Sequence, residues 1–94
     1  GLQLKDPAAD LGICASLASA VMDIELPSDV CFIGEVGLAG EVRPAGRTLM
    51  RVKEAARLGF TRAVISRRTP KESYPIEVLK ISSLREIVDL FLKR

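Results

Sequence analysis

The 94-residue sequence contains no histidine and only two cysteines, Cys14 and Cys31. A zinc site with four nitrogen or sulfur ligands therefore cannot be assembled from one copy of the chain. Both cysteines lie in apolar stretches, so we expect them to be ordinary buried thiols. A disulfide between them is possible, but a reducing cytoplasm disfavours it. The sequence thus predicts no metal site in this chain.

Long hydrophobic runs are also missing, because no stretch of about 18 or more apolar residues occurs. This excludes a membrane-spanning helix, and the first residues lack the basic start and apolar core of a signal peptide. Hydrophobic residues make up 48% of the chain and charged residues 28%, as is typical of a folded soluble protein. We expect a single small cytoplasmic domain over residues 1–94, burying only about 60% of its unfolded surface.

Aromatic residues are scarce, at 4% of the sequence, which argues against binding single strands by base stacking. Charge, by contrast, is unevenly spread. Residues 43–71 contain nine basic residues and one acid, Glu54, for a net charge of +8. The remainder has five basic and eleven acidic residues, for −6, so the chain as a whole carries +2. About a third of the sequence is therefore a basic block.

Three helices are expected, at residues 7–23, at residues 47–58 and from Ser83 onward. The first has Asp6 as its N-cap and Pro7 in the first helical position, where proline is favoured. Gly59 closes the second helix as a C-terminal glycine. The third begins with a capping box, in which Glu86 follows Ser83 by three residues.

Four strands are predicted between these helices, at residues 30–35, 38–43, 63–66 and 76–81, with a polar loop at residues 67–74. The resulting order is helix, strand, strand, helix, strand, strand, helix. It predicts an α+β fold in which helices cover one face of a mixed sheet.

The stretch from residue 34 to residue 44 fits no ordinary helix or strand pattern, because three glycines fall within seven residues. Such spacing is typical of a strand, a tight turn and a second strand. It matches neither the dinucleotide fingerprint nor a phosphate loop. Two glutamates flank the turn and could form an acid/base pair, although contacts to backbone N–H groups or to Arg43 fit them better. The predicted structural motif is Gly34, Glu35, Gly37, Gly40, Glu41 and Pro44.

Taken with the blocks at residues 4–11, 53–60 and 62–65, this stretch resembles the C-terminal domain of the bacterial RadA (Sms) family of DNA repair proteins. That domain is similar to the proteolytic domain of Lon proteases. The resemblance implies the Lon fold, which is related to the second domain of ribosomal protein S5. It also implies that several strands precede Gly1 in the full domain, so that the sheet here has an edge that neighbouring copies could cover.

A Lon-type protease needs a serine nucleophile and a nearby lysine base. By the resemblance, Ala8 occupies the serine position in the tetrad at residues 7–10 and has no hydroxyl. The lysine would fall at residues 46–49, which contain none. Ser16 and Ser19 lie in an alanine-rich helix and fit packed small residues better than nucleophiles. We therefore expect no catalytic residue and no enzyme activity in this chain.

The basic block is the strongest functional signal. A rotation of about 100° per residue places the basic residues of the second helix opposite its apolar side, facing solvent or a partner. Such a face is typical of phosphate binding with little sequence preference, although a merely solvated charged surface has the same pattern. The predicted DNA-binding residues are Arg43, Arg47, Arg51, Lys53, Arg57, Arg67 and Arg68.

The family resemblance implies a non-catalytic module that contacts DNA and scaffolds a hexameric ring. In that family a separate motor domain hydrolyses ATP and promotes branch migration in recombinational repair. ATP, magnesium and zinc would bind upstream domains, since this chain has no phosphate loop and no four-cysteine element. Two alternatives stay open: a Lon-type peptidase, active or degenerate, and a pure oligomerisation module whose basic face pairs with acidic surface on the adjacent subunit.

Overall fold

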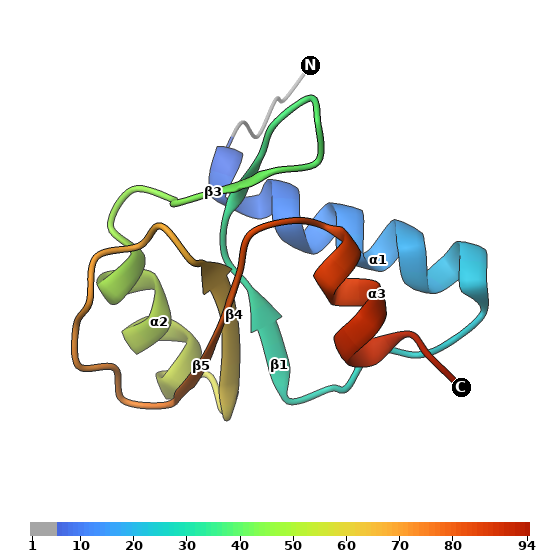
Figure 1. Ribbon diagram of the computed structural model, residues 1–94. Helices are drawn as coiled ribbons and strands as arrows, with labels where there is room; N and C mark the ends of the chain where they lie inside the picture. The colour runs from blue at the N-terminus through green and yellow to red at the C-terminus, as the bar shows by residue number, and fades with distance from the viewer. Residues whose placement is uncertain (1–5) are drawn as a thin grey trace, which may run out of the picture.

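The computed structural model describes residues 6–94. Within these residues a short 3-10 helix comes first, and three α-helices and five strands follow (Figure 1). In chain order they are η1 (Pro7–Ala9), α1 (Asp10–Met22), β1 (Val30–Phe32), β2 (Glu35–Val36), β3 (Val42–Arg43), α2 (Thr48–Arg57), β4 (Arg62–Ser66), β5 (Glu77–Ile81) and α3 (Arg85–Phe91).

The strands form two separate sheets. Strands β1, β4 and β5 make a parallel sheet in the order β1-β4-β5, with Cys31 opposite Ala63 and Ala63 opposite Val78. Strands β2 and β3 pair antiparallel in a two-stranded ribbon. The α+β class is confirmed, but the expectation of continuous strands at residues 30–35 and 38–43 was wrong. After Ile33 the chain leaves the parallel sheet, and β2 pairs with β3 instead.

Helices cover both faces of the parallel sheet, not one face as the sequence predicted. Helix α2 lies on one side, and α1 and α3 lie on the other (Figure 1). The reason is the central strand β4, whose side chains alternate between two apolar clusters. Val64 packs with the α1 and α3 side, whereas Ala63 and Ile65 pack with the α2 side. A parallel strand buried on both faces is apolar throughout and gives no alternating pattern from which to read its exposure.

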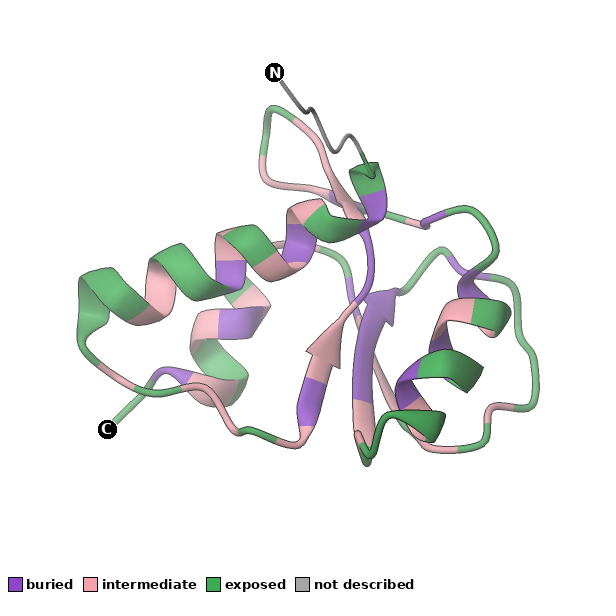
Figure 2. Ribbon diagram, turned by 180° about the vertical axis from the view of Figure 1, so that it is seen from behind, coloured by how far each residue is buried: buried purple, intermediate pink, exposed green. Residues whose placement is uncertain are grey.

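The core accordingly has two parts, visible as buried positions on both sides of the sheet in Figure 2. The α1/α3 cluster is formed by Leu11, Ala15, Val30, Val42, Val64, Ile81, Ile87 and Leu92. The α2 cluster is formed by Ala8, Ile33, Ala45, Val52, Ala63 and Ile65.

The predicted helix ends are largely confirmed. The Asp6 carboxylate accepts a hydrogen bond from the Ala8 amide at 3.1 Å, although the first turn is 3-10 and α1 proper begins at Asp10. Helix α2 ends in a Schellman motif, in which the Phe60 amide donates to the Ala55 carbonyl at 3.1 Å and Gly59 has φ of 101°. At α3, the Glu86 carboxylate accepts from the Ser83 amide at 3.0 Å, as a capping box requires.

Both cysteines are free thiols, as expected, but they are half-buried, not fully buried. Cys14 lies on α1 next to α3, and Cys31 packs against the α2 cluster on the other face of the sheet. Burial raises the pKa of the Cys31 thiol. No helix among the described residues is long and apolar enough to cross a membrane.

Candidate functional site

The glycine-rich stretch forms the tip of the β2–β3 ribbon. Glu35 lies opposite Arg43 and Val36 opposite Val42 in the antiparallel register. The turn between them is closed by backbone hydrogen bonds from the Gly37 amide to the Glu41 carbonyl, at 2.9 Å, and from the Gly40 amide to the Gly37 carbonyl, at 3.0 Å. Gly40 has φ of 83°, a left-handed conformation that glycine adopts without strain.

The Glu41 carboxylate fills this turn from the inside. Its Oε1 accepts from the Ala39 amide at 3.1 Å, and its Oε2 pairs with Arg43 Nη2 at 2.8 Å. A Cβ added at Gly37 would lie 2.2 Å from Glu41 Cδ, so only glycine leaves room for the carboxylate there. The Arg43 guanidinium, more than the backbone amides, lowers the pKa of the Glu41 carboxyl. Glu35 has no side-chain hydrogen bond or ion pair within residues 6–94.

The ribbon is tied to both ends of the fold. The Gly34 amide donates to the Ala8 carbonyl, and the Leu11 amide donates to the Gly34 carbonyl, both at 3.1 Å. On the other side, the Val42 amide donates to the Ser82 carbonyl at 2.9 Å. The ribbon is therefore a fixed part of the molecule, joined to the start of α1 and to the loop before α3.

The resemblance places a Lon-type dyad at Ala8 and at residues 46–49, and residues on either side of the second stretch pack with Ala8. Ala8 is buried in the same apolar cluster as Ala45 and Val52, and an ion pair of 2.9 Å joins Asp6 to Arg51 of α2. Ala8 has no hydroxyl, and residues 46–49 contain no lysine. Ser16 is exposed on α1. The Ser19 hydroxyl donates to the Ile24 carbonyl at 2.5 Å, and so joins the last turn of α1 to the segment that follows it.

Most of the basic block is neutralised by carboxylates, some two or three residues away and others distant in the sequence. Five of its nine cations form ion pairs, and no sequence pattern indicates the long-range ones. The pairs are Arg43 with Glu41, Arg51 with Asp6, Arg57 with Glu54, Arg62 with Asp29, and Arg67 with Glu86.

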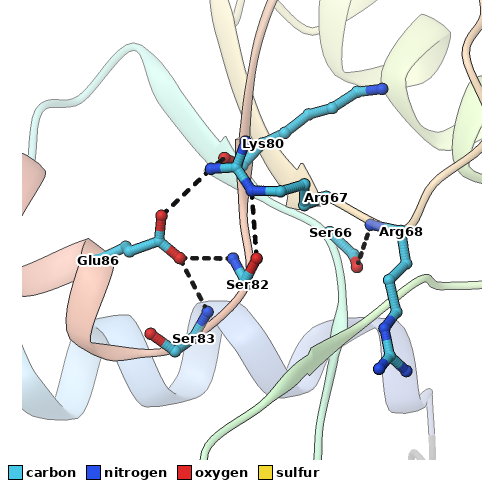
Figure 3. A network of polar contacts seen from close by, with 7 residues as sticks. All are labelled: Ser66, Arg67, Arg68, Lys80, Ser82, Ser83 and Glu86. Atoms are coloured by element: carbon cyan, nitrogen blue, oxygen red, sulfur yellow. Dashed lines mark hydrogen bonds and ion pairs between the residues drawn. The ribbon is translucent and has the colours of Figure 1, made fainter.

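The Arg67 side chain takes part in a network of hydrogen bonds and one ion pair (Figure 3). Its guanidinium donates to the Lys80 carbonyl at 2.8 Å and to the Ser82 hydroxyl at 3.2 Å, and it pairs with Glu86 at 3.3 Å. The Ser82 amide donates to the same glutamate at 2.6 Å and is the main cause of the lowered pKa of Glu86. Arg67 thus joins the end of β4 to the start of α3, and the Arg68 side chain points away from this network (Figure 3).

Four cations of the block have no ion-pair partner among the described residues: Arg47, Lys53, Arg68 and Lys71. All four are exposed. Arg47 precedes α2 in a left-handed conformation with φ of 60°, and within residues 6–94 its side chain donates a hydrogen bond only to the Met50 sulfur, at 3.2 Å. Of the seven predicted DNA-binding residues, Arg47, Lys53 and Arg68 thus remain unpaired. Lys71 is likewise exposed and without an ion-pair partner within residues 6–94, although the prediction from the sequence placed it only in the basic block and not among the DNA-binding residues.

Within residues 6–94 no group of three or more His, Cys, Asp or Glu side chains could hold a metal ion.

Comparison with known proteins finds a matching family model and several relatives named DNA repair protein RadA. A family model described as subunit ChlI of Mg-chelatase matches residues 2–69. The DNA repair protein RadA of Bacillus subtilis is 54% identical over 65 residues, covering 69% of this chain and 14% of that protein. RadA of Mycolicibacterium smegmatis is 41% identical over 88 residues, covering 94% of this chain and 19% of its own length.

RadA of Aquifex aeolicus is 36% identical over 90 residues, covering 96% of this chain and 20% of that protein. The chain therefore spans about a fifth of the length of the curated relatives it matches. The resemblance drawn from residues 4–11, 34–44, 53–60 and 62–65 is confirmed by these relatives.

Proposed function

Because this chain belongs to the RadA family of DNA repair proteins, in a stretch that the ChlI family model covers, we propose that it is a non-catalytic module that contacts DNA phosphates. The proposal is supported by four exposed cations that have no carboxylate partner within residues 6–94, namely Arg47, Lys53, Arg68 and Lys71. A cation that is already paired with a carboxylate neutralises DNA phosphate less well and so releases fewer counterions from the DNA. The unpaired cations therefore supply the attraction for phosphate.

The binding should be largely independent of sequence. Contacts from flexible lysine and arginine side chains to phosphate position a protein on the duplex but carry no base information. Of the four aromatic residues, Phe32 and Phe91 pack edge to face with ring centroids 5.9 Å apart, which leaves little aromatic surface for stacking on bases. Duplex or branched DNA is therefore the proposed ligand.

For the whole protein we propose the activities of the family: an ATP-hydrolysing motor that promotes branch migration and assembles as a hexameric ring in the cytoplasm. ATP, magnesium and zinc would bind parts of the protein outside residues 1–94. These assignments rest on the family resemblance, and the chain described here supplies the DNA-contacting and scaffolding module.

We further propose that the fold is that of the Lon proteolytic domain, related to ribosomal protein S5 domain 2, with strands contributed by the preceding part of the protein. Support comes from β1, which pairs only with β4 among the described strands, so that its other edge carries backbone groups without a strand partner. Apolar hollows adjoin this strand on both sides, and Phe32 lines both of them.

The lack of a Lon-type dyad favours a binding module over a peptidase. The Ala8 side chain has no nucleophilic group, and residues 46–49 contain no lysine that could act as the base. A serine-reactive probe distinguishes the two. Labelling of Ser16 or Ser19, or cleavage of an unstructured substrate, would establish the peptidase alternative.

The DNA contact is tested by charge reversal at the unpaired cations. We expect Arg47→Glu with Lys53→Glu to weaken duplex DNA binding by about tenfold or more, because two phosphate contacts are replaced by repulsion. Fluorescence anisotropy with a labelled duplex measures the affinity. Arg51 is left unchanged because it holds Asp6 and the Gly46 carbonyl.

The control for net charge is Arg85→Glu in α3 with Lys93→Glu just after it. It changes the net charge by the same amount outside the basic block, at two exposed cations that both pair with Asp89. This control should bind DNA nearly as the parent chain does. Equal losses in the two variants would show that only net charge matters, and unchanged affinity in the first would rule the α2 cations out.

A second candidate, oligomerisation without DNA contact, is favoured by the outward face of α1. Ile13, Leu17 and Val21 are 57%, 62% and 85% exposed, which leaves an apolar stripe without a partner within residues 6–94. Leu17→Glu should then shift the molar mass measured by light scattering toward the monomer. A chain that stays monomeric with and without the substitution would remove this candidate.

A further inference from the structure

The start of α2 has the features of an anion site. Its N-cap residue, Arg47, makes no capping hydrogen bond through its side chain, and the first turn contains no acidic residue. The first amides of a helix have no partner within it, and the helix dipole gives that end a partial positive charge. Among the described residues, no backbone or side-chain acceptor outside the helix satisfies the amides of Thr48, Leu49 and Met50.

The backbone before the helix aims these amides inward. Arg47 is left-handed, with φ of 60° and ψ of 40°, and Thr48 follows in the right-handed helical region. A left-handed residue next to a right-handed one turns successive N–H groups toward a common point, which is the geometry of backbone anion nests. The Thr48 hydroxyl does not compete for these amides, because it donates to the Ala45 carbonyl at 2.7 Å.

An independent observation points to a ligand at the same place. Thr69 lies in the loop after β4, is only 6% exposed, and lines the hollow that the first turn of α2 also lines. Its hydroxyl oxygen has no hydrogen-bond partner in the part of the chain that the structure describes. Buried hydroxyls are nearly always paired, so an unpaired one beside free helix amides indicates a missing acceptor.

The hollow is large enough for a small anion. Its volume of about 330 Å³ falls at the lower end of the range of about 300–1,000 Å³ for ligand pockets. Its charged lining residues are Arg47 and Glu72. Arg47 favours an anion in the hollow and Glu72 opposes one, and the helix amides and the Thr69 hydroxyl add to the attraction.

We propose that this hollow binds a phosphate group, held by the amides of Thr48, Leu49 and Met50 and by the hydroxyl of Thr69. The phosphate could belong to DNA or to a free phosphate compound, since both present the same acceptor oxygens. As a DNA contact the site rests on the proposed function, whereas its affinity for free phosphate does not.

Inorganic phosphate tests the site alone. We expect the amide resonances of Thr48, Leu49 and Met50 of the 94-residue chain to shift saturably in a heteronuclear NMR titration. Thr69→Val should weaken the binding by about tenfold, because it removes a hydrogen bond to a charged group. Thr69→Ser keeps the hydroxyl and should bind as the parent does, and Glu72→Gln should bind more tightly.

Shifts at these amides that do not saturate, or equal affinity in Thr69→Val, would overturn the proposal. A titration of the same variants with duplex DNA shows whether the bound phosphate belongs to DNA or to a free phosphate compound. If Thr69→Val weakens DNA binding as well, the site contacts the DNA backbone. If it weakens only phosphate binding, the site takes a free phosphate compound, and the DNA contact is decided by the Arg47 and Lys53 variant alone.

Discussion

Gly34 is the residue at which the chain leaves the parallel sheet, and its replacement gives the sharpest test of how the ribbon is attached. A Cβ at this position would lie 3.3 Å from both Leu11 Cδ2 and Val42 Cγ1, and 3.4 Å from the Arg43 carbonyl oxygen. Leu11 is fully buried and Val42 is 2% exposed, so neither neighbour can move into open space. Gly34→Ala therefore has to overpack the junction of α1 and β3.

The magnitude follows from two opposing effects. Overpacking a well-packed core costs about 1–3 kcal/mol, and replacing glycine by alanine restricts the unfolded chain, which returns about 0.4–1 kcal/mol. We expect a net loss of about 0–2.6 kcal/mol in the free energy of unfolding, which is a fall of up to about 10–20 °C in Tm for a domain of this size.

Gly46→Ala is the matched control, because a Cβ there meets nothing within 4 Å and its φ lies outside the left-handed region. This variant should gain about 0.4–1 kcal/mol through the unfolded state alone. Urea unfolding followed by far-UV circular dichroism measures both variants. Equal stability changes in the two, or a Gly34→Ala variant more stable than the parent, would refute the packing at the ribbon junction.

Two further predictions concern polar contacts. A hydrogen bond from Arg62, followed by one from Thr61, lowers the pKa of Asp29 from its ordinary value of 3.8 to about 2. The stabilisation by the ionised carboxylate is therefore present above about pH 4 and is lost as the pH falls toward 2. The stability difference between the parent and Asp29→Asn, from urea unfolding over a pH series, should shrink across that window, and a constant difference would contradict the assignment. Gly37→Ala should displace the Glu41 carboxylate from the turn and speed amide hydrogen exchange at the ribbon tip without unfolding the core, and unchanged exchange there would show that the carboxylate is dispensable.

The helix boundaries were predictable from the sequence because capping is local. Asp6, Gly59 and Glu86 each satisfy backbone groups within a few residues, and their spacing alone signals the helix end. The position of the ribbon was not predictable. Residues 30–35 have the composition of one strand, and only the contact of Gly34 with Ala8 and Leu11 shows where the strand stops.

The basic surface was only partly predictable. A helical projection places basic residues of α2 on its outer side, but it cannot show that Asp6, 45 positions away, pairs with Arg51. Nor can it show that Arg67 is engaged by Glu86. The prediction from the sequence therefore included cations that are paired with carboxylates in the fold. Within residues 6–94 the candidate DNA-binding surface is reduced to Arg47, Lys53, Arg68 and Lys71. Sequence reasoning missed Thr69 altogether, because a lone threonine in a polar loop carries no signal.

The salt dependence of duplex DNA affinity tests the central claim most directly, since each phosphate contact contributes about 0.9 to the slope of log affinity against log salt concentration. We predict a steep slope for the parent chain and a slope shallower by about 1.8 for Arg47→Ala with Lys53→Ala. The Arg85→Ala, Lys93→Ala control should keep the parent slope. A parent affinity that does not change with salt, or an equal slope in the Arg47 and Lys53 variant, would contradict the proposal that the unpaired cations bind DNA.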